Sequence, residues 1–117
     1  MARILIVEHD PVVGTDLFMQ VDDMGHEAVG PVGSAYEAMR EVRQGRIDGA
    51  FLDCKLIGED SREVADALSL RGVPFAYVTG VADFRESFPG WPSAPVLLKP
   101  ISANDITGFV SELAVSA

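Results

Sequence analysis

Five short apolar runs recur along the chain, and they constrain its fold more than any other feature. The clearest, residues 47–53, passes through Ala50, Phe51 and Leu52 and ends at Asp53. Apolar runs this short are typical of strands buried on both faces of a parallel sheet. In such sheets, ligands bind just beyond the carboxyl ends of the strands. Asp53 therefore stands where a functional site is expected.

Four more runs predict strands of the same kind, and segments with helical spacing of apolar residues separate them. The predicted strands are Arg3–Val7, 26–32, 74–78 and Val96–Leu98, and Gly30 with Pro31 is expected to shorten the second. The predicted helices are 11–24, 34–45, 61–72 and 102–115, with Val12 and Leu70 among their apolar positions. Residues 54–60 are expected to form a polar loop. Residues 82–88 have room for two helical turns only, because prolines follow.

Strands that alternate with helices predict an α/β fold. We expect a doubly wound, five-stranded parallel sheet of flavodoxin-like order 2-1-3-4-5, with helices on both faces and a short or irregular fourth helix. A chain of 117 residues is long enough for one core, so residues 1–117 are interpreted as one domain. This strand order sets the first and third strands side by side, which predicts that Glu8, Asp10 and Asp53 converge.

Composition excludes several classes of function. The formal net charge is −9, from 18 acidic and 9 basic residues, and no cluster of Lys and Arg suited to nucleic acid is present. No apolar run has the roughly 20 residues needed to span a bilayer, and the N-terminus lacks the pattern of a signal peptide. The single cysteine, Cys54, cannot form an internal disulfide. We therefore expect a cytoplasmic protein that contacts neither nucleic acid nor membrane.

Polar side chains follow four of the predicted strands: Glu8 with His9 and Asp10, then Asp53, Thr79 and Lys99. Acids on neighbouring strands form a suitable cradle for Mg²⁺, which prefers oxygen ligands. A lysine and a hydroxyl nearby are suited to hold an anion on the central carboxylate, and carboxylates serve as phosphoryl-accepting nucleophiles. Phosphoryl transfer depends mostly on positioning and charge neutralisation. The set is therefore consistent with transfer of a phosphoryl group to Asp53.

Four motifs, VEHD, FLDCKLIGED, YVTG and VLLKP, occur in an order and spacing that resembles a response-regulator receiver domain. The resemblance covers essentially the whole chain. Each motif is weak alone, and the four together, closed by a Lys-Pro pair, are specific. The stretch VPFAYVTG further resembles a stand-alone receiver subgroup whose fourth strand reads PFxFATG and whose fourth helix is reduced.

The resemblance implies a role for each matching residue. Asp53 matches the phosphoacceptor, Thr79 the hydroxyl that binds a phosphoryl oxygen, and Lys99 the lysine that bridges to the acyl phosphate. Glu8 matches one of the paired acids near Mg²⁺, and Asp53 and the backbone carbonyl of Lys55 match its other ligands. The implied phosphodonor is a histidine kinase or a histidine phosphotransfer protein. The protein would then be no enzyme but a single-domain response regulator that signals to an unknown protein by contact.

Two positions depart from the family pattern. His9 stands where the family has its second acid, and imidazole suits Zn²⁺, Ni²⁺ or Cu²⁺ better than Mg²⁺. Mg²⁺ binding is therefore expected to be weak. Two interpretations of His9 stay open: a residue at the solvent edge with no ligand role, which we favour, and a metal ligand. Val96 stands where many receivers carry a Tyr or Phe that moves with the threonine, so activation is expected to appear elsewhere.

The same residues are compatible with other interpretations. A receiver-like adaptor that works without phosphorylation is the main alternative, favoured by His9 and Val96. A flavin or nucleotide binder of the same fold is disfavoured, since no Gly-rich phosphate loop follows the first strand. Cys54 is interpreted as a packed small residue rather than a redox sensor. Trp91 is interpreted as packing over the short fourth helix, with partner binding as the alternative.

Overall fold

A computed structural model describes residues 1–116 of the chain and the side chains of residues 1–113. Its centre is a five-stranded parallel sheet of order β2-β1-β3-β6-β7. These strands are β1 (Arg3–Val7), β2 (Glu27–Val32), β3 (Gly49–Asp53), β6 (Phe75–Thr79) and β7 (Val96–Leu98). The predicted order 2-1-3-4-5 is confirmed, because β6 and β7 are the fourth and fifth strands of this sheet.

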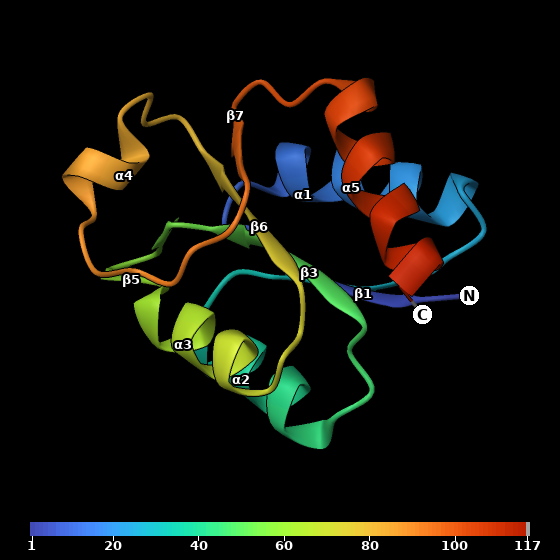
Figure 1. The fold of residues 1–117 in the computed structure, drawn as a ribbon, viewed down its shortest axis with the longest axis horizontal. Helices are drawn as coiled ribbons and strands as arrows, with labels where there is room; N and C mark the ends of the chain where they lie inside the picture. Colours follow the sequence, from blue (N-terminus) through green and yellow to red (C-terminus); the bar gives the residue numbers. More distant parts are fainter. Residues whose placement is uncertain (117) are drawn as a thin grey trace.

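Helices cover both faces of the sheet, as predicted (Figure 1). α1 (Pro11–Asp23) and α5 (Ala103–Ser116) pack on one face, and α2 (Ala35–Gln44) and α3 (Arg62–Leu70) pack on the other. Two hydrophobic clusters form, because alternate side chains of each strand point to opposite faces. Ile4 and Ile6 join the first layer, whereas Leu5 and Val7 join the second. None of the helices within residues 1–116 is long and apolar enough to cross a membrane.

Two predicted segments differ from the structure near the strand ends. Residues 54–60, expected as a loop, form an antiparallel hairpin of β4 (Lys55–Leu56) and β5 (Glu59–Asp60). The buried side chain of Leu56 anchors this hairpin to the second core layer. The expected shortening of β2 is wrong. The strand continues to Val32 because an extra residue bulges out of the β1–β2 ladder, with Gly30 at a φ of +105°.

Two predicted core positions are also wrong. Val12 is 77% exposed and Leu70 is 89% exposed. Each residue lies at an end of its helix. The apolar pattern continues there, but the sheet no longer covers the helix. The rest of both stripes is confirmed, since Leu17 and Val21 of α1 and Val64 of α3 are buried.

The fourth helix is short, as predicted: α4 spans only Phe84–Ser87. It lies with the hairpin at the carboxyl end of the strands (Figure 1). Residues 80–95 around it are held by an aromatic cluster in which Trp91 packs 5.7 Å from Phe84 and 6.0 Å from Tyr77, between ring centroids. The Tyr77 hydroxyl donates to the Pro92 carbonyl at 2.6 Å. Trp91 therefore packs over the short helix, as the favoured interpretation expected.

Candidate functional site

Asp53 ends β3 with its side chain buried, and several neighbouring groups contact it. Lys55 N–H donates to Oδ1 at 3.3 Å, and the Lys99 ammonium donates to Oδ2 at 3.5 Å. His9 Nδ1 is hydrogen-bonded to the same Oδ2. The buried Ser61 hydroxyl donates to the Asp53 backbone carbonyl, so that the end of the strand is fixed as well as the carboxylate.

Glu8 lies beside Asp53 because β1 and β3 are neighbours in the sheet. Its Oε2 accepts from Asp10 N–H at 3.0 Å and from Lys99 Nζ at 3.2 Å. Burial of this carboxyl and its hydrogen bond with Asp53 raise the pKa of Glu8 to about 7, although Asp10 N–H and Lys99 act in the opposite direction. Two buried carboxyl groups this close favour a proton or a cation between them.

Lys99 bridges the two acids from the end of β7. Its Nζ lies 3.1 Å from Glu8 Oε1 and 3.5 Å from Asp53 Oδ2. Burial lowers the pKa of Lys99, but the charges of Asp53 and Glu8 outweigh burial and leave its pKa above the ordinary value. The lysine therefore stays charged between the acids. This convergence of Glu8, Asp53 and Lys99 agrees with the sequence prediction.

The predicted convergence of Asp10 is wrong. Its carboxylate accepts from Val12 N–H at 2.9 Å and so caps the N-terminus of α1. Among the described residues, the cluster of possible metal ligands is Glu8, His9 and Asp53, without Asp10. The physical reason lies in Pro11, which starts the helix immediately after Asp10 and commits that residue to the N-cap position.

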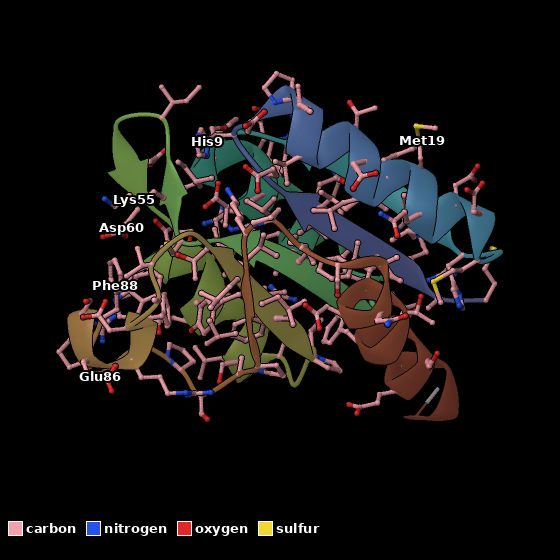
Figure 2. All side chains as sticks on the ribbon, turned by 90° about the horizontal axis from the view of Figure 1, so that it is seen from above. His9, Met19, Lys55, Asp60, Glu86 and Phe88 are labelled. Atoms are coloured by element: carbon pink, nitrogen blue, oxygen red, sulfur yellow. The ribbon has the colours of Figure 1, made fainter. Side chains whose placement is uncertain are left out.

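His9 lies closer to the site than the favoured interpretation expected. Its side chain is 41% exposed, yet Nδ1 contacts Asp53 and lies 3.5 Å from Glu8 Oε2. Figure 2 shows His9 at the end of the sheet where α1 begins. One potential ligand atom from each of Glu8, His9 and Asp53 lies within 4.8 Å of the others. This cluster could hold a metal ion.

Thr79 ends β6 with its side chain buried, and its hydroxyl already has two partners. Oγ1 accepts from Val81 N–H at 3.0 Å and lies 3.1 Å from the Cys54 thiol. No hydrogen bond joins Thr79 to the Asp53 carboxylate within the part of the chain that the structure describes. Sequence reasoning anticipated that Cys54 is packed and missed its contact with Thr79. One indication of this contact was present in the sequence: Cys54 directly follows Asp53, at the end of a strand that is adjacent to β6.

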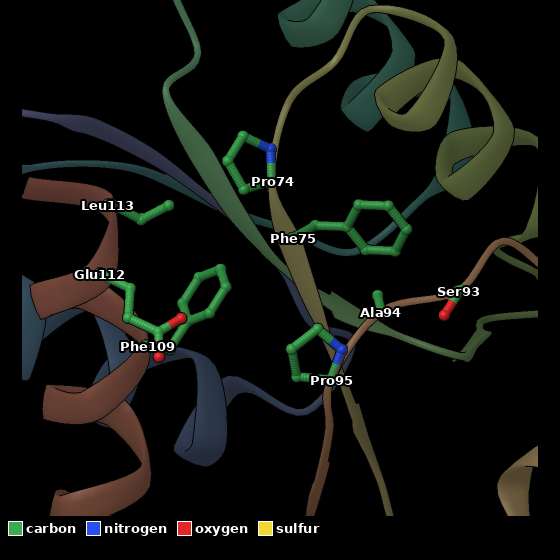
Figure 3. Close-up of a pocket in the computed structure, with 8 residues that line it drawn as sticks. All are labelled: Pro74, Phe75, Ser93, Ala94, Pro95, Phe109, Glu112 and Leu113. Carbon is green, nitrogen blue, oxygen red and sulfur yellow. The ribbon is translucent and has the colours of Figure 1, made fainter. Parts of the chain in front are cut away.

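Several hollows lie on the surface around the sheet. One of about 260 Å³ lies at the amino ends of β6 and β7, with Phe75, Pro95 and Phe109 in its wall (Figure 3). It is far along the strands from Asp53 and belongs to no part of the site. Another, of about 290 Å³, lies between α1 and residues 99–101, which precede α5, and Lys99 forms part of its wall. The second hollow therefore adjoins the site.

No family model and no curated protein sequence matches the chain. Solved structures do. SdrG from Sphingomonas melonis Fr1 is 34% identical over 97% of both chains, with a TM-score of 0.82. The receiver domain of a sensor histidine kinase from Pseudomonas aeruginosa PAO1 is 22% identical over 94% of this chain and 98% of its own, with a TM-score of 0.79. The response regulator TrrA from Thermotoga maritima is 22% identical over 97% and 99%, with a TM-score of 0.82.

The chain belongs to the response-regulator receiver family. Receivers are CheY-like signalling proteins of two-component systems rather than classical enzymes. The P. aeruginosa receiver was solved with magnesium coordinated in its active-site cleft, and TrrA was solved in complex with Mg²⁺ and BeF. In the present receiver, the cluster of Glu8, His9 and Asp53 occupies the carboxyl end of the two central strands.

Proposed function

We propose that residues 1–117 form a single-domain response regulator that accepts a phosphoryl group on Asp53. The observation that carries this proposal is the position of the Lys99 ammonium, 3.5 Å from Asp53 Oδ2 and 3.2 Å from Glu8 Oε2. A buried carboxylate beside a fixed cation, at the carboxyl end of a parallel sheet, is suited to hold an incoming anion. The proposed donor is a histidine kinase or a histidine phosphotransfer protein.

The proposed step is a displacement at phosphorus. A carboxylate oxygen of Asp53 attacks the phosphorus of a phosphohistidine, and the P–N bond breaks. The imidazole leaves with the electron pair and takes a proton from solvent, while Asp53 becomes a mixed acyl phosphate. Lys99 offsets negative charge on the phosphoryl oxygens, and Lys55 N–H orients the carboxylate through Oδ1.

The residues present fit a divalent cation in part. Glu8 Oε1 is buried, and no group within residues 1–113 donates a hydrogen bond to it, although Lys99 Nζ lies 3.1 Å away. Glu8, Asp53 and the Lys55 carbonyl would hold Mg²⁺, which when bound would neutralise charge on the phosphoryl oxygens. His9 supplies a nitrogen in place of the second acid. We therefore expect Mg²⁺ to bind weakly.

Thr79 and the segment that follows it are the proposed route of activation. Its hydroxyl would leave Cys54 and Val81 N–H and bind a phosphoryl oxygen, which would shift residues 80–95. Hydrogen bonds from Arg62 to the Gly90 carbonyl and from Arg85 to the Ala94 carbonyl, at 3.1 and 2.8 Å, hold that segment before the shift. The altered surface of residues 80–95, β7 and α5 would then bind or release an unknown protein partner. We expect this to take place in the cytoplasm, without contact with membrane or nucleic acid.

Labelling by a small phosphodonor tests the proposal directly. Acetyl phosphate or phosphoramidate with Mg²⁺ should give an acyl phosphate on the wild-type chain, detected by intact mass and lost on treatment with hydroxylamine. Asp53→Asn should take no label. Asp10→Asn is the matched control. Asp10 is an acid that directly follows His9 and lies outside the cluster, and Asn retains its N-cap function. The proposal is wrong if Asp53→Asn is labelled as fully as the wild type.

A receiver-like adaptor that works without phosphorylation remains the second candidate. The contact of His9 with Asp53 favours it, because the imidazole occupies the oxygen that Lys99 also contacts. This candidate predicts no acyl phosphate under any donor or metal condition. Recovery of labelling in His9→Asp alone would identify His9 as the block to phosphorylation.

A further inference from the structure

We propose that the site of Glu8, His9 and Asp53 selects a late first-row divalent cation, such as Co²⁺, Ni²⁺ or Zn²⁺, over Mg²⁺. This inference rests on the proposed function, since it names the cofactor class of the same site. It follows from one substitution in the donor set: an imidazole nitrogen stands among carboxylate oxygens where an all-oxygen set would favour Mg²⁺.

The donors already converge. The ligand atoms of Glu8, His9 and Asp53 lie within 4.8 Å of one another, and His9 Nδ1 lies 3.5 Å from Glu8 Oε2. Two of the three residues, Glu8 and Asp53, come from adjacent central strands that are buried on both faces. The main-chain positions of the two acids are therefore fixed by the sheet, and only side-chain rotations are needed to receive an ion.

A buried oxygen without a donor is the second observation. The Glu8 side chain has no exposed surface, and Oε1 accepts no hydrogen bond from any residue up to 113. Lys99 Nζ lies 3.1 Å from this oxygen without the geometry of a hydrogen bond, and it donates to Oε2 instead. A buried carboxylate oxygen without a donor is costly. A cation bound at Oε1 would remove that cost.

His9 is free to exchange its present partner for an ion. Its side chain is 41% exposed, so the ring can turn without disturbing the core. The hydrogen bond between Nδ1 and Asp53 Oδ2 occupies both atoms now, and an ion between them would replace it. Neutral imidazole binds Zn²⁺, Ni²⁺ and Co²⁺ well, whereas Mg²⁺ gives up its water shell reluctantly and gains little from nitrogen.

Lys99 opposes any cation equally, because its charge does not distinguish one divalent ion from another. It therefore lowers the affinity of the site for Mg²⁺ and Zn²⁺ alike. Which of the two ions binds more tightly depends on the donor atoms. His9 is the single residue among these whose chemistry separates the two classes of metal.

Calorimetric titration of the full chain with Mg²⁺, Co²⁺, Ni²⁺ and Zn²⁺ tests this selectivity. The late metals should bind at least about tenfold more tightly than Mg²⁺. In His9→Asp, Mg²⁺ should bind about tenfold more tightly than in the wild type, and the ratio of late-metal affinity to Mg²⁺ affinity should fall. The matched control is His26→Gln. His26 is the other histidine of the chain, and its Nδ1 accepts from Ala2 N–H at 2.9 Å, outside the site.

Proton NMR of the histidine rings supplies a readout that does not depend on phosphorylation. Co²⁺ should shift and broaden the ring signals of His9 and leave those of His26 in place. Mg²⁺ binding as tightly as Co²⁺, or an unchanged ratio of late-metal affinity to Mg²⁺ affinity in His9→Asp, would overturn the inference. Labelling of Asp53 with saturating Mg²⁺ could still succeed in that case. Conversely, the predicted metal order with no label on Asp53 would refute the proposed function alone.

Discussion

The hydroxyl of Thr79 is held by two neighbouring residues, Val81 and Cys54. It accepts from Val81 N–H at 3.0 Å and lies 3.1 Å from the thiol of Cys54, and the side chains of Thr79 and Cys54 are buried. The thiol follows the proposed acceptor directly in sequence. Cys54 therefore contacts both residues of the proposed switch: it is bonded to Asp53 through the main chain and lies against Thr79 through its side chain.

A double-mutant cycle measures this contact. Cys54→Ala and Thr79→Val should each lower the free energy of unfolding, and together they should lower it by less than the sum. The coupling energy should be about 0.5–1.5 kcal/mol, the range of a buried neutral hydrogen bond. Urea unfolding of the four variants gives the value. Cys54→Ala with Thr107→Val is the control, because Thr107 lies exposed on α5, and its coupling should be near zero.

At the residue scale, the sequence predicted which side chains lie close together, and it predicted their hydrogen-bond partners less well. Glu8, Asp53 and Lys99 lie at the carboxyl ends of three strands of the sheet, so strand order alone brings them together. The hydrogen bond between His9 and Asp53 depends on the side-chain rotamer of His9, which cannot be predicted from the spacing of residues in the sequence. Ser61 illustrates the same limit, since it stands at the N-cap position of α3 and its hydroxyl donates to the Asp53 carbonyl rather than accepting from the helix.

Among the secondary-structure elements, β2 shows how a bulge can be mistaken for the end of a strand. Gly30 has a φ of +105°, and a Cβ added there would lie 2.8 Å from the carbonyl oxygen of Ile6. Glycine thus allows the strand to insert one residue and continue pairing with β1 up to Val32. From the sequence, Gly30 and Pro31 indicated an interruption, because both residues are rare inside strands.

Gly30→Ala should destabilise the fold strongly. The positive φ alone should cost about 1–3 kcal/mol of unfolding free energy, and the close approach to Ile6 should add to it. Gly72→Ala is the matched control, because Gly72 has a φ of +69° with open space around its Cβ position, and it should cost only about 1 kcal/mol. Equal losses in the two variants would show that the contact with β1 contributes nothing.

The β4–β5 hairpin could not be predicted for a different reason. Each of its strands has two residues, too few for an alternating pattern to be recognised. Its position depends on tertiary contacts: Leu56 is buried in the second core layer, and Glu59 accepts from Ala35 N–H at 3.2 Å, at the start of α2. A long buried strand can be predicted from its own composition, whereas this hairpin can be predicted only if the residues that contact it are known.

For the whole molecule, Glu8 links stability to pH. Burial raises its pKa from 4.5 in the unfolded chain to about 7 in the folded one. The folded state therefore binds the proton more tightly, so the stabilisation is complete below pH 4.5 and is lost as pH rises through about 7. In wild type without metal, the free energy of unfolding should contain a component that falls across this window.

Glu8→Gln should remove that component. The amide keeps the shape of the side chain and cannot ionise, so its unfolding free energy should fall less between pH 4.5 and 7 than that of the wild type. Urea unfolding across the window, with a chelator present, measures the difference. Glu112→Gln on the exposed face of α5 controls for the loss of one carboxyl. Parallel pH profiles in wild type and Glu8→Gln would contradict the prediction.

The aromatic cluster over α4 has one more consequence for the molecule. Trp91 is the single tryptophan of the chain, and its ring lies 5.2 Å from Phe88 and 6.0 Å from Tyr77, between centroids. Its indole emission therefore comes from within residues 80–95, because no other tryptophan contributes to it. The segment proposed to move after Thr79 carries its own fluorophore, so its motion can be followed in real time in the unmodified protein.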